Sequence, residues 1–407
     1  MMSSKKYVIL LIVILLVVFS CSKKRELKWK YDLGETLKVQ TDPLYISDYN
    51  IIVTWRIDVK KLDREKQEGE YVVPKVNTFG SDIEMELQNK KFYANLVALN
   101  ANNGKEVWKT VSLGSSDQNL SSPSYYNGNI YVGSDNNFVS EINASNGKIK
   151  WQYDTGSWVY AEVFVNENYI LAGNEEGYVF LWDRKTKKLM FKKKIGYIEK
   201  KWIVKNGFIY GSSENKIYKL NLDGEIEHKY ILKDEYKNFS NQLATDPPIK
   251  SKLLFEDKYC YFTAESDYLY KLDIKNWKII WKKKIETSLS SPIYHDNKIF
   301  IGTEKNLIAL NSETGEIMNE YKTNNRWIDY DIRFRKGGAV NGEARIFDNT
   351  VYFGSYDYAL YAYNIDDENL RWTYKIKHHI DRTRPVVTDD FVCFGADSHH
   401  LYLLKKY

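Results

Sequence analysis

Two pairs of histidines near the C-terminus are the residues whose types and spacing suggest chemistry in this 407-residue chain. His378 and His379 precede Asp381 in "KHHID", and His399 and His400 follow Asp397 in "ADSHH". Imidazole nitrogens and carboxylates are ligands that zinc accepts. Four of the six histidines lie in these two segments, which makes them weak candidates for metal ligands. Ordinary surface loops rich in polar residues are the favoured alternative.

Other signatures of catalysis are missing from the sequence. It contains no Cys-x-x-Cys, no His-Glu-x-x-His and no glycine-rich phosphate loop. Asp329, Asp331 and Glu343 could supply carboxylates, but no ligand set accompanies them. Cys260 and Cys393 fall in apolar segments, so we expect buried core residues more readily than a disulfide. We therefore expect no enzyme activity, no cofactor and no resident metal.

The N-terminus has the pattern of an export signal. Lys5 and Lys6 precede an apolar run of thirteen residues from Tyr7 to Phe19, which is shorter than the roughly 20 residues that a spanning helix needs. "VFSC", ending at Cys21, resembles a bacterial lipobox. We expect residues 1–20 to be a cleaved signal peptide, Cys21 to carry a lipid and residues 21–26 to be a tether. A simple secretory signal with a chance cysteine is the alternative.

The charge pattern argues against nucleic acid as a partner. The formal charge is +5, and it falls to +3 once the two lysines of the signal are removed. A nucleic-acid footprint needs a clustered basic excess, and the sequence contains none. The membrane is the partner that the N-terminus predicts, with the chain exported and held at a bacterial membrane, in the first instance the outer membrane facing the periplasm.

A repeat runs through the remainder of the chain and must position every candidate residue. "NGKEVW", ending at Trp108, returns as "NGKIKW" at Trp151, and the following anchors are Phe191, His228, Trp281, Asn319 and Trp372. The intervals are 43, 40, 37, 53, 38 and 53 residues. Propeller blades of four strands repeat at about 40 to 45 residues, and insertions explain the two longer intervals. The tryptophans are expected to wedge against the neighbouring blade.

One unit of the repeat shows its four strands. Residues 121–126, 129–133, 138–143 and 148–153 are short segments rich in Tyr, Ile and Val, separated by Gly, Asn and Asp. The last repeat stops at Tyr407 without its fourth strand, while "ELKWKYDLG" near the N-terminus is a fourth strand with no other three. We predict an all-β, eight-bladed propeller over residues 27–407, built of four-stranded antiparallel blades. The N-terminal strand, with Trp29, pairs with the C-terminal blade and closes the ring.

The motif "G-x-I-Y-V-G-S … L-x-A-L-N-x-x-x-G-K-x-x-W" resembles the quinoprotein-type propeller repeat and covers Leu27 to Tyr407. It is similar to the propeller lipoproteins of the outer-membrane β-barrel assembly machinery. The dehydrogenases that share this repeat imply a pyrroloquinoline quinone pocket with adjacent cysteines, which this chain lacks. The resemblance therefore implies a non-enzymatic, monomeric scaffold for a protein partner. A lipoprotein that captures a sugar or peptide remains an alternative, and a quinone-dependent dehydrogenase is a weaker one.

Three segments exceed the repeat, at residues 60–93, 233–249 and 323–340. All three are connections that alternating strands send to one face of the disk, and long loops on a rigid frame commonly carry binding. The third segment contains "RWIDYDIRFRKGG", which is rich in the residue types of interface hot spots. The partner-binding candidates are Arg326, Trp327, Tyr330, Arg333, Phe334 and Arg335. Packing of these aromatics onto their own propeller is an equal alternative.

Overall fold

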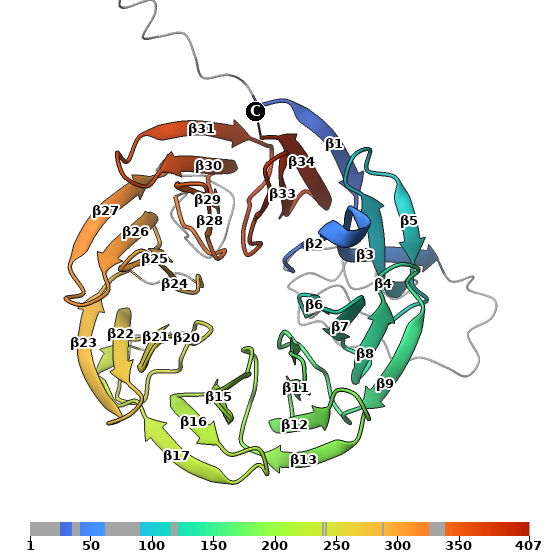
Figure 1. Ribbon diagram of the computed structural model, residues 1–407. Coiled ribbons are helices and arrows are strands. Elements are labelled where there is room, and N and C mark those ends of the chain that lie inside the picture. The colour runs from blue at the N-terminus through green and yellow to red at the C-terminus, as the bar shows by residue number, and fades with distance from the viewer. Residues whose placement is uncertain are drawn as a thin grey trace, which may run out of the picture.

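Eight four-stranded antiparallel sheets surround a central axis and form a closed disk, as the sequence predicts (Figure 1). The structure is a computed structural model, and it describes residues 25–34, 41–61, 90–114, 121–237, 240, 242–286, 289–324 and 338–406. Each sheet is one blade, and its first strand is the one nearest the axis.

The first four blades are continuous in sequence. Blade 1 contains β2 (Leu44–Ile46), β3 (Ile51–Lys61), β4 (Lys90–Asn100) and β5 (Glu106–Lys109), with the short 3-10 helix η1 (Ser47–Tyr49) after β2. Blade 2 contains β6 (Ser124–Tyr126), β7 (Asn129–Gly133), β8 (Phe138–Asn143) and β9 (Ile149–Asp154). Blade 3 contains β10 (Phe164–Val165), β11 (Tyr169–Gly173), β12 (Tyr178–Asp183) and β13 (Leu189–Lys194). Blade 4 contains β14 (Ile203–Lys205), β15 (Phe208–Ser213), β16 (Lys216–Leu220) and β17 (Ile226–Ile231).

The last four blades follow a small hairpin of β18 (Tyr236–Lys237) and β19 (Leu243–Ala244). Blade 5 contains β20 (Leu254–Glu256), β21 (Tyr259–Thr263), β22 (Tyr268–Asp273) and β23 (Lys278–Lys284). Blade 6 contains β24 (Ile293–His295), β25 (Lys298–Gly302), β26 (Asn306–Asn311) and β27 (Ile317–Lys322). Blade 7 contains β28 (Arg345–Phe347), β29 (Thr350–Ser355), β30 (Ala359–Asn364) and β31 (Leu370–Lys375). Blade 8 contains β32 (Val386–Val387), β33 (Phe391–Ala396), β34 (His400–Lys405) and β1 (Leu27–Asp32).

The turn between the first two strands of a blade explains part of the repeat's composition. In blade 2 it consists of Asn127 and Gly128, with φ of 46° and 76°. Blade 7 uses Asp348 and Asn349, with φ of 48° and 50°. Two consecutive residues with positive φ form the tight turn whose twist matches paired strands, and Asn, Asp and Gly tolerate that conformation best.

The N-terminal strand closes the ring as predicted. β1 pairs antiparallel with β34, so that Tyr31 lies opposite Leu401 and Asp32 opposite His400. Without β1, the backbone edge of β34 would be open to pairing with another chain. The closure therefore joins the two ends of the sequence in one sheet.

A contact at the rim joins each outer strand to the next blade. Trp29, Trp108 and Trp281 each donate an indole N–H to a backbone carbonyl of the following blade, at 3.0, 2.9 and 3.2 Å. Each ring also covers a glycine in the turn between the third and fourth strands of that blade. We call this stacking of an outer-strand side chain on the next blade's turn the rim contact. It explains why Gly and Trp recur together.

In other blades the rim contact forms between the same outer-strand and turn positions, although the residue types differ. Phe191 covers Gly224. Lys187 takes the turn position opposite Trp151, with its ammonium 5.7 Å from the ring centre. Between blades 4 and 5 the partners are exchanged, because the turn carries Trp277 and the outer strand carries His228, with ring centres 4.1 Å apart.

The two remaining rim contacts use polar side chains. Between blades 6 and 7, Asn319 donates to Glu368 at 2.6 Å. Between blades 7 and 8 no turn follows β34, and the guanidinium of Arg25 lies 5.1 Å from the ring centre of Trp372 instead. Arg25 precedes Trp29 by four positions, as Gly104 precedes Trp108 and Gly147 precedes Trp151.

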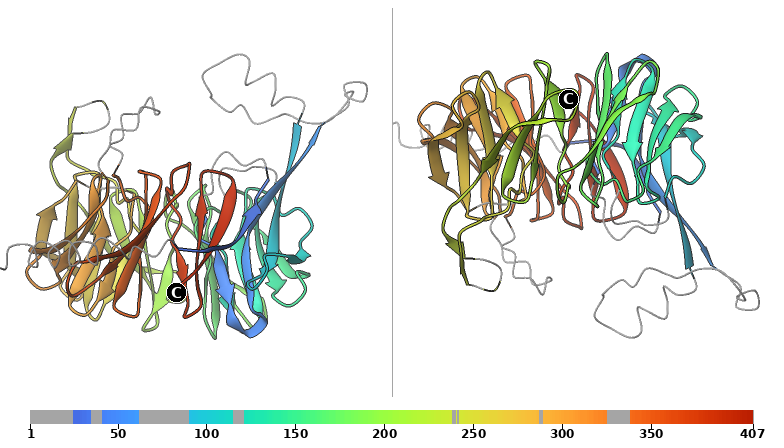
Figure 2. Two further views of the ribbon diagram at one scale, coloured as in Figure 1. Left: turned by 90° about the horizontal axis from the view of Figure 1, so that it is seen from above. Right: turned by 90° about the horizontal axis from the view of Figure 1, so that it is seen from below.

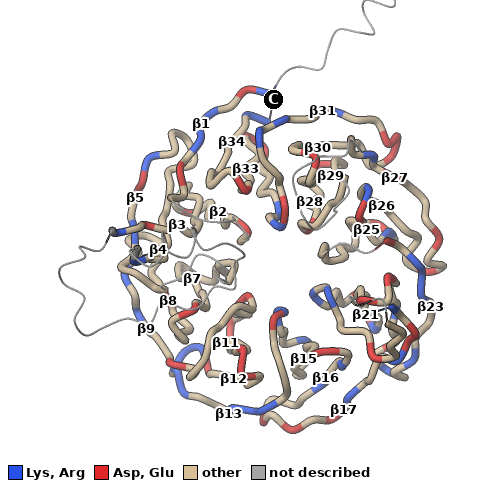
Figure 3. The backbone as a smooth tube through the Cα atoms, turned by 180° about the vertical axis from the view of Figure 1, so that it is seen from behind, with Lys and Arg blue, Asp and Glu red and all other residues tan. Residues whose placement is uncertain are grey.

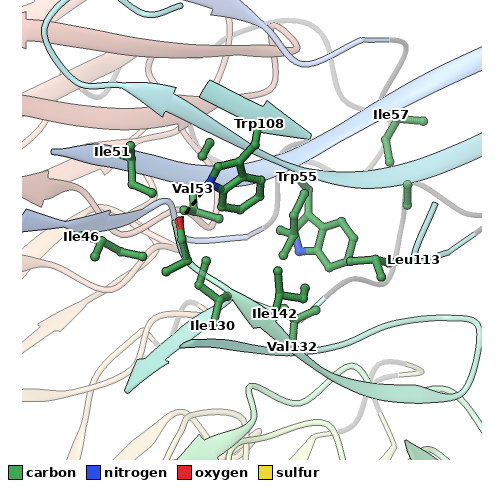
Figure 4. Close-up of a cluster of buried hydrophobic side chains, with 14 residues drawn as sticks. Ile46, Ile51, Val53, Trp55, Ile57, Trp108, Leu113, Ile130, Val132 and Ile142 are labelled. Carbon is green, nitrogen blue, oxygen red and sulfur yellow. Dashed lines mark hydrogen bonds between the residues drawn. The ribbon is translucent and has the colours of Figure 1, made fainter. Parts of the chain in front are cut away.

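The hydrophobic core is divided among the interfaces between blades. Figure 4 shows one such cluster, in which Trp55 and Trp108 of blade 1 lie against Ile130, Val132 and Ile142 of blade 2. Trp55 also donates to the carbonyl of Ser121 at 2.9 Å. Every blade therefore depends on its two neighbours for burial of its faces.

We expect deletion of residues 27–33 to lower the melting temperature by about 10 °C or more and to cause aggregation. Loss of a buried tryptophan such as Trp29 alone costs about 3–5 kcal/mol, and each kcal/mol shifts the midpoint of a large domain by about 2–4 °C. Thermal unfolding and light scattering are the measurements. A chain lacking only residues 1–24 is the reference, and equal midpoints for the two chains would contradict ring closure by β1.

We expect Gly147→Ala to cost about 3 kcal/mol, against about 1 kcal/mol for Gly207→Ala. Both glycines have positive φ, 70° and 77°, which costs an alanine roughly 1–2 kcal/mol. A Cβ on Gly147 would lie 2.5 Å from the ring of Trp108, whereas nothing lies within 4 Å of one on Gly207; overpacking adds about 1–3 kcal/mol.

Denaturant unfolding in a double-mutant cycle isolates the rim contact. In a Trp108→Ala background the two glycine substitutions should cost the same. A Gly147→Ala penalty that persists without the indole would show that the backbone conformation, and not the rim contact, requires glycine there.

Candidate functional site

Eight equivalent residues, one from each blade, meet at the propeller axis. Each lies two positions before the first strand of its blade, and Figure 3 shows charges of both signs at the inner ends of the blades. We call this set the axial ring: Asp42, Ser122, Glu162, Lys201, Lys252, Ser291, Glu343 and Arg384. It contains three acidic residues, three basic residues and two serines, so its formal charge is zero.

Lys252 of blade 5 is the centre of the axial ring. Its ammonium lies 3.1 Å from Glu162 of blade 3, 3.6 Å from Glu343 of blade 7 and 4.0 Å from Asp42 of blade 1. Blades 1 and 5 are opposite one another in the disk. Because one side chain bonds to three acidic residues from well-separated blades, the ion pairs cross the axis.

The other members complete the network between neighbouring blades. Arg384 contacts Glu343 at 2.8 Å and Asp42 at 3.8 Å, and its backbone N–H donates to Asp42 at 2.7 Å. Lys201 pairs with Glu162. The serines accept backbone N–H bonds from the preceding blade: Ser122 from Asp42 at 3.0 Å and Ser291 from Lys252 at 3.1 Å.

In several blades a hydroxyl residue before the axial position helps to fix its direction. Ser121 accepts from the backbone N–H of Gly133 at 2.7 Å, and Thr383 donates to the carbonyl of Gly395 at 2.9 Å. Ser251 accepts from the backbone N–H of Thr263 at 2.9 Å in the same way. These bonds tie the entering chain to the end of the blade's second strand. The next side chain is thereby held at the axis.

Local charges favour the ionised forms of Glu162 and Lys252 in the axial ring. Burial alone would raise the pKa of Glu162, but Lys252 and Lys201 outweigh it and lower that pKa to about 2. For Lys252, burial is outweighed by Glu343, Glu162 and Asp42, which raise its pKa. The exception is Asp42, whose pKa burial raises despite Arg384 and Lys252. The three carboxylate side chains are only 11–15% exposed, so their interactions with the cations are weakly screened.

This arrangement joins blades to one another through ion pairs. Each cation of the axial ring has a carboxylate within 4 Å, so the ring leaves no surplus charge for an anionic ligand. No Ser, Thr or Cys in the ring is bonded to a basic side chain in the manner of an activated nucleophile. Within the ranges that the structure describes, no three His, Cys, Asp or Glu side chains stand close enough to hold a metal ion.

The insertions that the structure describes rise from one face of the disk. Figure 2 shows the extended β3–β4 hairpin and the β18–β19 hairpin projecting from the same side, which we call the insertion-bearing face. β3 and β4 have 11 residues each, whereas the sequence suggested an insertion beginning at Lys60 and ending at Tyr93. Two residues at the start of the expected insertion and four at its end belong to the strands, because β3 continues to Lys61 and β4 begins at Lys90.

The two histidine segments lie side by side, since the backbone N–H of Asp397 donates to the carbonyl of His379 at 2.9 Å, but the other sequence-predicted residues lie elsewhere. Arg326, Trp327, Tyr330, Arg333, Phe334, Arg335 and Cys21 lie outside the described residues. His379 stacks on Tyr356 with ring centres 3.7 Å apart, and its Nδ1 contacts the Tyr356 carbonyl at 2.5 Å. His400 bonds to the carbonyl of Ser398, and His378 is exposed. Cys260 and Cys393 are buried, unlinked thiols in different sheets.

The axial ring is the set of residues that the sequence reasoning missed. Glu343 was considered there only as an isolated carboxylate. The available signal was positional: the axial residue immediately precedes proline in four blades, at Pro43, Pro123, Pro292 and Pro385.

The comparisons with known proteins agree with this architecture. The crystal structure of BamB from Moraxella catarrhalis has 14% identity and a TM-score of 0.57, over 77% of this chain and 93% of that one. A europium-containing methanol dehydrogenase has 9% identity and a TM-score of 0.64, over 93% of each chain. The computationally designed protein Ika8 has 12% identity and a TM-score of 0.64, over 92% of this chain and 99% of that one. At these identities the likeness establishes the fold alone.

Sequence comparison gives the family. No curated protein matches the chain at a significant level. In the described part of the chain, no helix has the length and apolar character to cross a membrane. The family described as outer membrane protein assembly factor BamB matches residues 90–162 and 238–407. More than half of the sequence is covered by this match, and the chain belongs to that family.

Proposed function

We propose that this protein is a non-enzymatic scaffold that holds a protein partner at the insertion-bearing face and is anchored to a membrane by a lipid on Cys21. In its most specific form it is an accessory of β-barrel assembly at the outer membrane, on the periplasmic side. Family membership supports the assembly role, and the structural neighbour that is an enzyme shares only the fold with this chain.

The axial ring is the observation that carries the non-enzymatic part of the proposal. The axis is where a propeller brings residues of all its blades together, and here the residues that meet are bonded to one another. Ligand sites need polar groups with capacity left for the ligand. In the axial ring, Lys252 and Arg384 already engage Glu162, Glu343 and Asp42. Binding is therefore assigned to the face and not to the axis.

The described start of the chain suits a tether at the rim. Arg25 lies against Trp372 at the edge of blade 7, and Cys21 precedes Arg25 by four positions in the sequence. A partner in the membrane, held by the insertion-bearing face, would supply the second attachment and raise the effective concentration of both proteins.

We expect an affinity-tagged full-length chain, purified from membranes in mild detergent, to bring down a membrane protein. Trp327→Ala combined with Arg333→Ala should lower the yield of that membrane protein at least tenfold. Aromatic and arginine hot spots contribute about 2 kcal/mol or more each. Quantitative mass spectrometry measures the yield. Lys148→Ala, on the opposite face, is the matched control for the partner yield. Cys21→Ser, which removes the proposed lipid anchor, should move the chain out of the membrane fraction. Equal yields from the double variant and wild type, at equal melting temperatures, would place the interface elsewhere.

We expect Lys252→Met to lower the stability of the ligand-free protein by about 2–3 kcal/mol at neutral pH. Removing one partner of a buried ion pair costs about 3–5 kcal/mol, and we discount this value because the Lys252 side chain is one-third exposed. If Lys252 were instead an unpaired cation kept for an anionic ligand, Lys252→Met would raise the stability of the ligand-free protein, because it would remove repulsion between Lys252 and the neighbouring cations.

The pH dependence gives a second readout of Lys252→Met. The pKa of Glu162 is lowered from its ordinary 4.5 to about 2, so its ion pairs stabilise the fold above about pH 4.5 and cease to do so as the pH falls toward about 2. The difference between wild type and variant should therefore narrow across this window. Chemical unfolding at several pH values is the measurement, with Lys148→Met as the control. A variant as stable as wild type at pH 7 would mean that the axial ring does not brace the disk.

A further inference from the structure

Trp158 is a large aromatic residue that the propeller exposes on its insertion-bearing face. It lies in the connection from β9 to β10, which is of the same kind as the connection that carries the β18–β19 hairpin, and it is 38% exposed. Its backbone carbonyl accepts the N–H of Glu175, in the turn between β11 and β12, at 2.8 Å. Pro248 and Ala339 occupy the same position before blades 5 and 7, where their carbonyls accept equivalent bonds. The fold therefore needs the backbone of this position but not an aromatic side chain.

Tyr197 is the equivalent residue in the next connection, from β13 to β14, and it is 44% exposed. In both connections the following residue supplies the core contact. Val159 lies against Gly133, and Ile198 lies against Gly173. Both of these aliphatic residues are fully buried. Core packing thus belongs to the aliphatic residue, and the aromatic residue before it is left at the surface.

The turn between β11 and β12 joins these two connections and carries carboxylates. It is bonded to the first connection through the N–H of Glu175. It is bonded to the second through the carbonyl of Gly177, which accepts the N–H groups of Ile195 and Gly196 at 2.8 and 3.2 Å. Glu175 is partly exposed and Glu176 is exposed. Negative charge therefore lies between two connections that each expose an aromatic residue.

Buried hydrogen bonds hold this turn in one shape. Asn174 is fully buried, and its Nδ2 donates to the carbonyl of Thr155, in the first connection, at 3.0 Å. Its Oδ1 accepts the backbone N–H of Tyr178 at 2.9 Å. A Cβ on Gly177 would lie 2.4 Å from the carbonyl oxygen of Gly196, so the turn and the second connection touch directly. A site whose parts are fixed in advance loses less conformational entropy when a partner binds.

The charge on these segments is mainly negative. The Tyr197 hydroxyl donates to Glu199 at 2.9 Å. Burial, this hydrogen bond and the charge of Glu175 all raise the pKa of Tyr197. Glu199 also lies 3.6 Å from Lys200. Residues 155–160, 174–177 and 195–200 together contain three glutamates and one lysine, and negative charge beside exposed aromatic rings favours a cationic ligand.

We propose that Trp158, Tyr197 and Glu175 bind an arginine side chain of the protein partner. A guanidinium is planar and always charged, so it can stack on an aromatic ring while its N–H groups bond to a carboxylate. This inference rests on the proposed function as a partner-holding scaffold and names the chemistry of one contact on the insertion-bearing face.

The charges favour a guanidinium over a sugar ring as the ligand. Both ligands stack on aromatic side chains, but a neutral sugar gains no Coulomb attraction from the carboxylates. Lysine has the charge without the planar fork, so it cannot stack and bond to a carboxylate in the same way. An arginine of the partner uses the exposed rings and the carboxylates together.

Fluorine nuclear magnetic resonance of the full-length chain in detergent, labelled with 5-fluorotryptophan, tests the inference at the site itself. The chain has 11 tryptophans, and Trp158→Phe identifies the resonance of Trp158. N-acetylarginine amide should shift this resonance in a saturable way. It should bind about fivefold more tightly than N-acetylcitrulline amide, which has a planar head of the same size without the charge.

Removal of the carboxylates separates charge recognition from stacking. Glu175→Gln with Glu176→Gln keeps the size of both side chains, and in this variant the arginine and citrulline amides should bind equally. Glu167→Gln with Glu225→Gln makes the same change of charge at exposed residues of the opposite face and should keep the preference for arginine. The fluorine spectrum of each variant also reports whether the propeller is folded.

Capture of the membrane partner tests whether the protein uses this site. Glu175→Gln with Glu176→Gln should lower the yield of the membrane protein about fivefold. Glu167→Gln with Glu225→Gln should leave that yield unchanged. A full yield from the variant that has lost its preference for arginine would show that the partner binds without this site and would overturn the inference.

Two further outcomes would overturn the inference, and one would reject the scaffold function instead. Equal affinities of wild type for the arginine and citrulline amides would show that the carboxylates do not recognise the charge. A saturable shift of the Trp158 resonance by methyl α-D-glucopyranoside, with none by the arginine amide, would assign the rings to a carbohydrate. Absence of any captured partner, with the preference for arginine intact, would reject the scaffold function and leave guanidinium recognition established.

Discussion

The rim contact is the interaction on which the rest of the disk depends. A blade has two apolar faces and can bury them only against its neighbours, so the orientation of each blade must be set by the one before it. A flat side chain on the outer strand, stacked on the next blade's turn, sets that orientation far from the axis, where a small rotation produces the largest displacement. The turn residue has positive φ at seven of the eight interfaces, and glycine meets this need at four of them.

The exceptions show that the rim contact recurs from blade to blade as a geometry, and not as a fixed pair of residue types. Trp277 and His228 exchange the large and small partners between turn and outer strand, and the stacked pair remains. At the junction of the two chain ends there is no turn, and Arg25 lies against Trp372 in its place. A pattern search for Gly-x-x-x-Trp finds the period through such exceptions only because the neighbouring blades fix the register.

The rim contact repeats along the chain and the residue types of the axial ring do not, which explains how much of the fold and of the site could be predicted from the sequence. Blade number, strand order and ring closure depend on local signals repeated many times, namely tight turns, alternating strands and the rim pair, and all of them could be predicted. The axial ring could not, because its members share a position and not a chemical type: Asp42, Lys252 and Ser122 resemble one another in nothing but register. Their compatibility depends on pairs hundreds of residues apart, such as Asp42 with Arg384. The full length of β3 and β4 was not predicted either, because residues 60–93 exceed the repeat and were assigned to an insertion.

The axial ring and the rim contacts stabilise the disk in different directions. Rim contacts join only neighbours, so a ring held by them alone would open at its weakest interface, where Asn319 and Glu368 replace the aromatic pair. Lys252 reaches Glu343 across blade 6, and Arg384 joins Glu343 to Asp42 around the closure. Blade 7, on one side of the weak interface, is thus tied to blade 5 directly and to blade 1 through Arg384. On the other side, Ser291 of blade 6 accepts from the backbone N–H of Lys252. A disk braced in this way is a rigid frame for the insertions on one face, and loops on a rigid frame commonly carry binding.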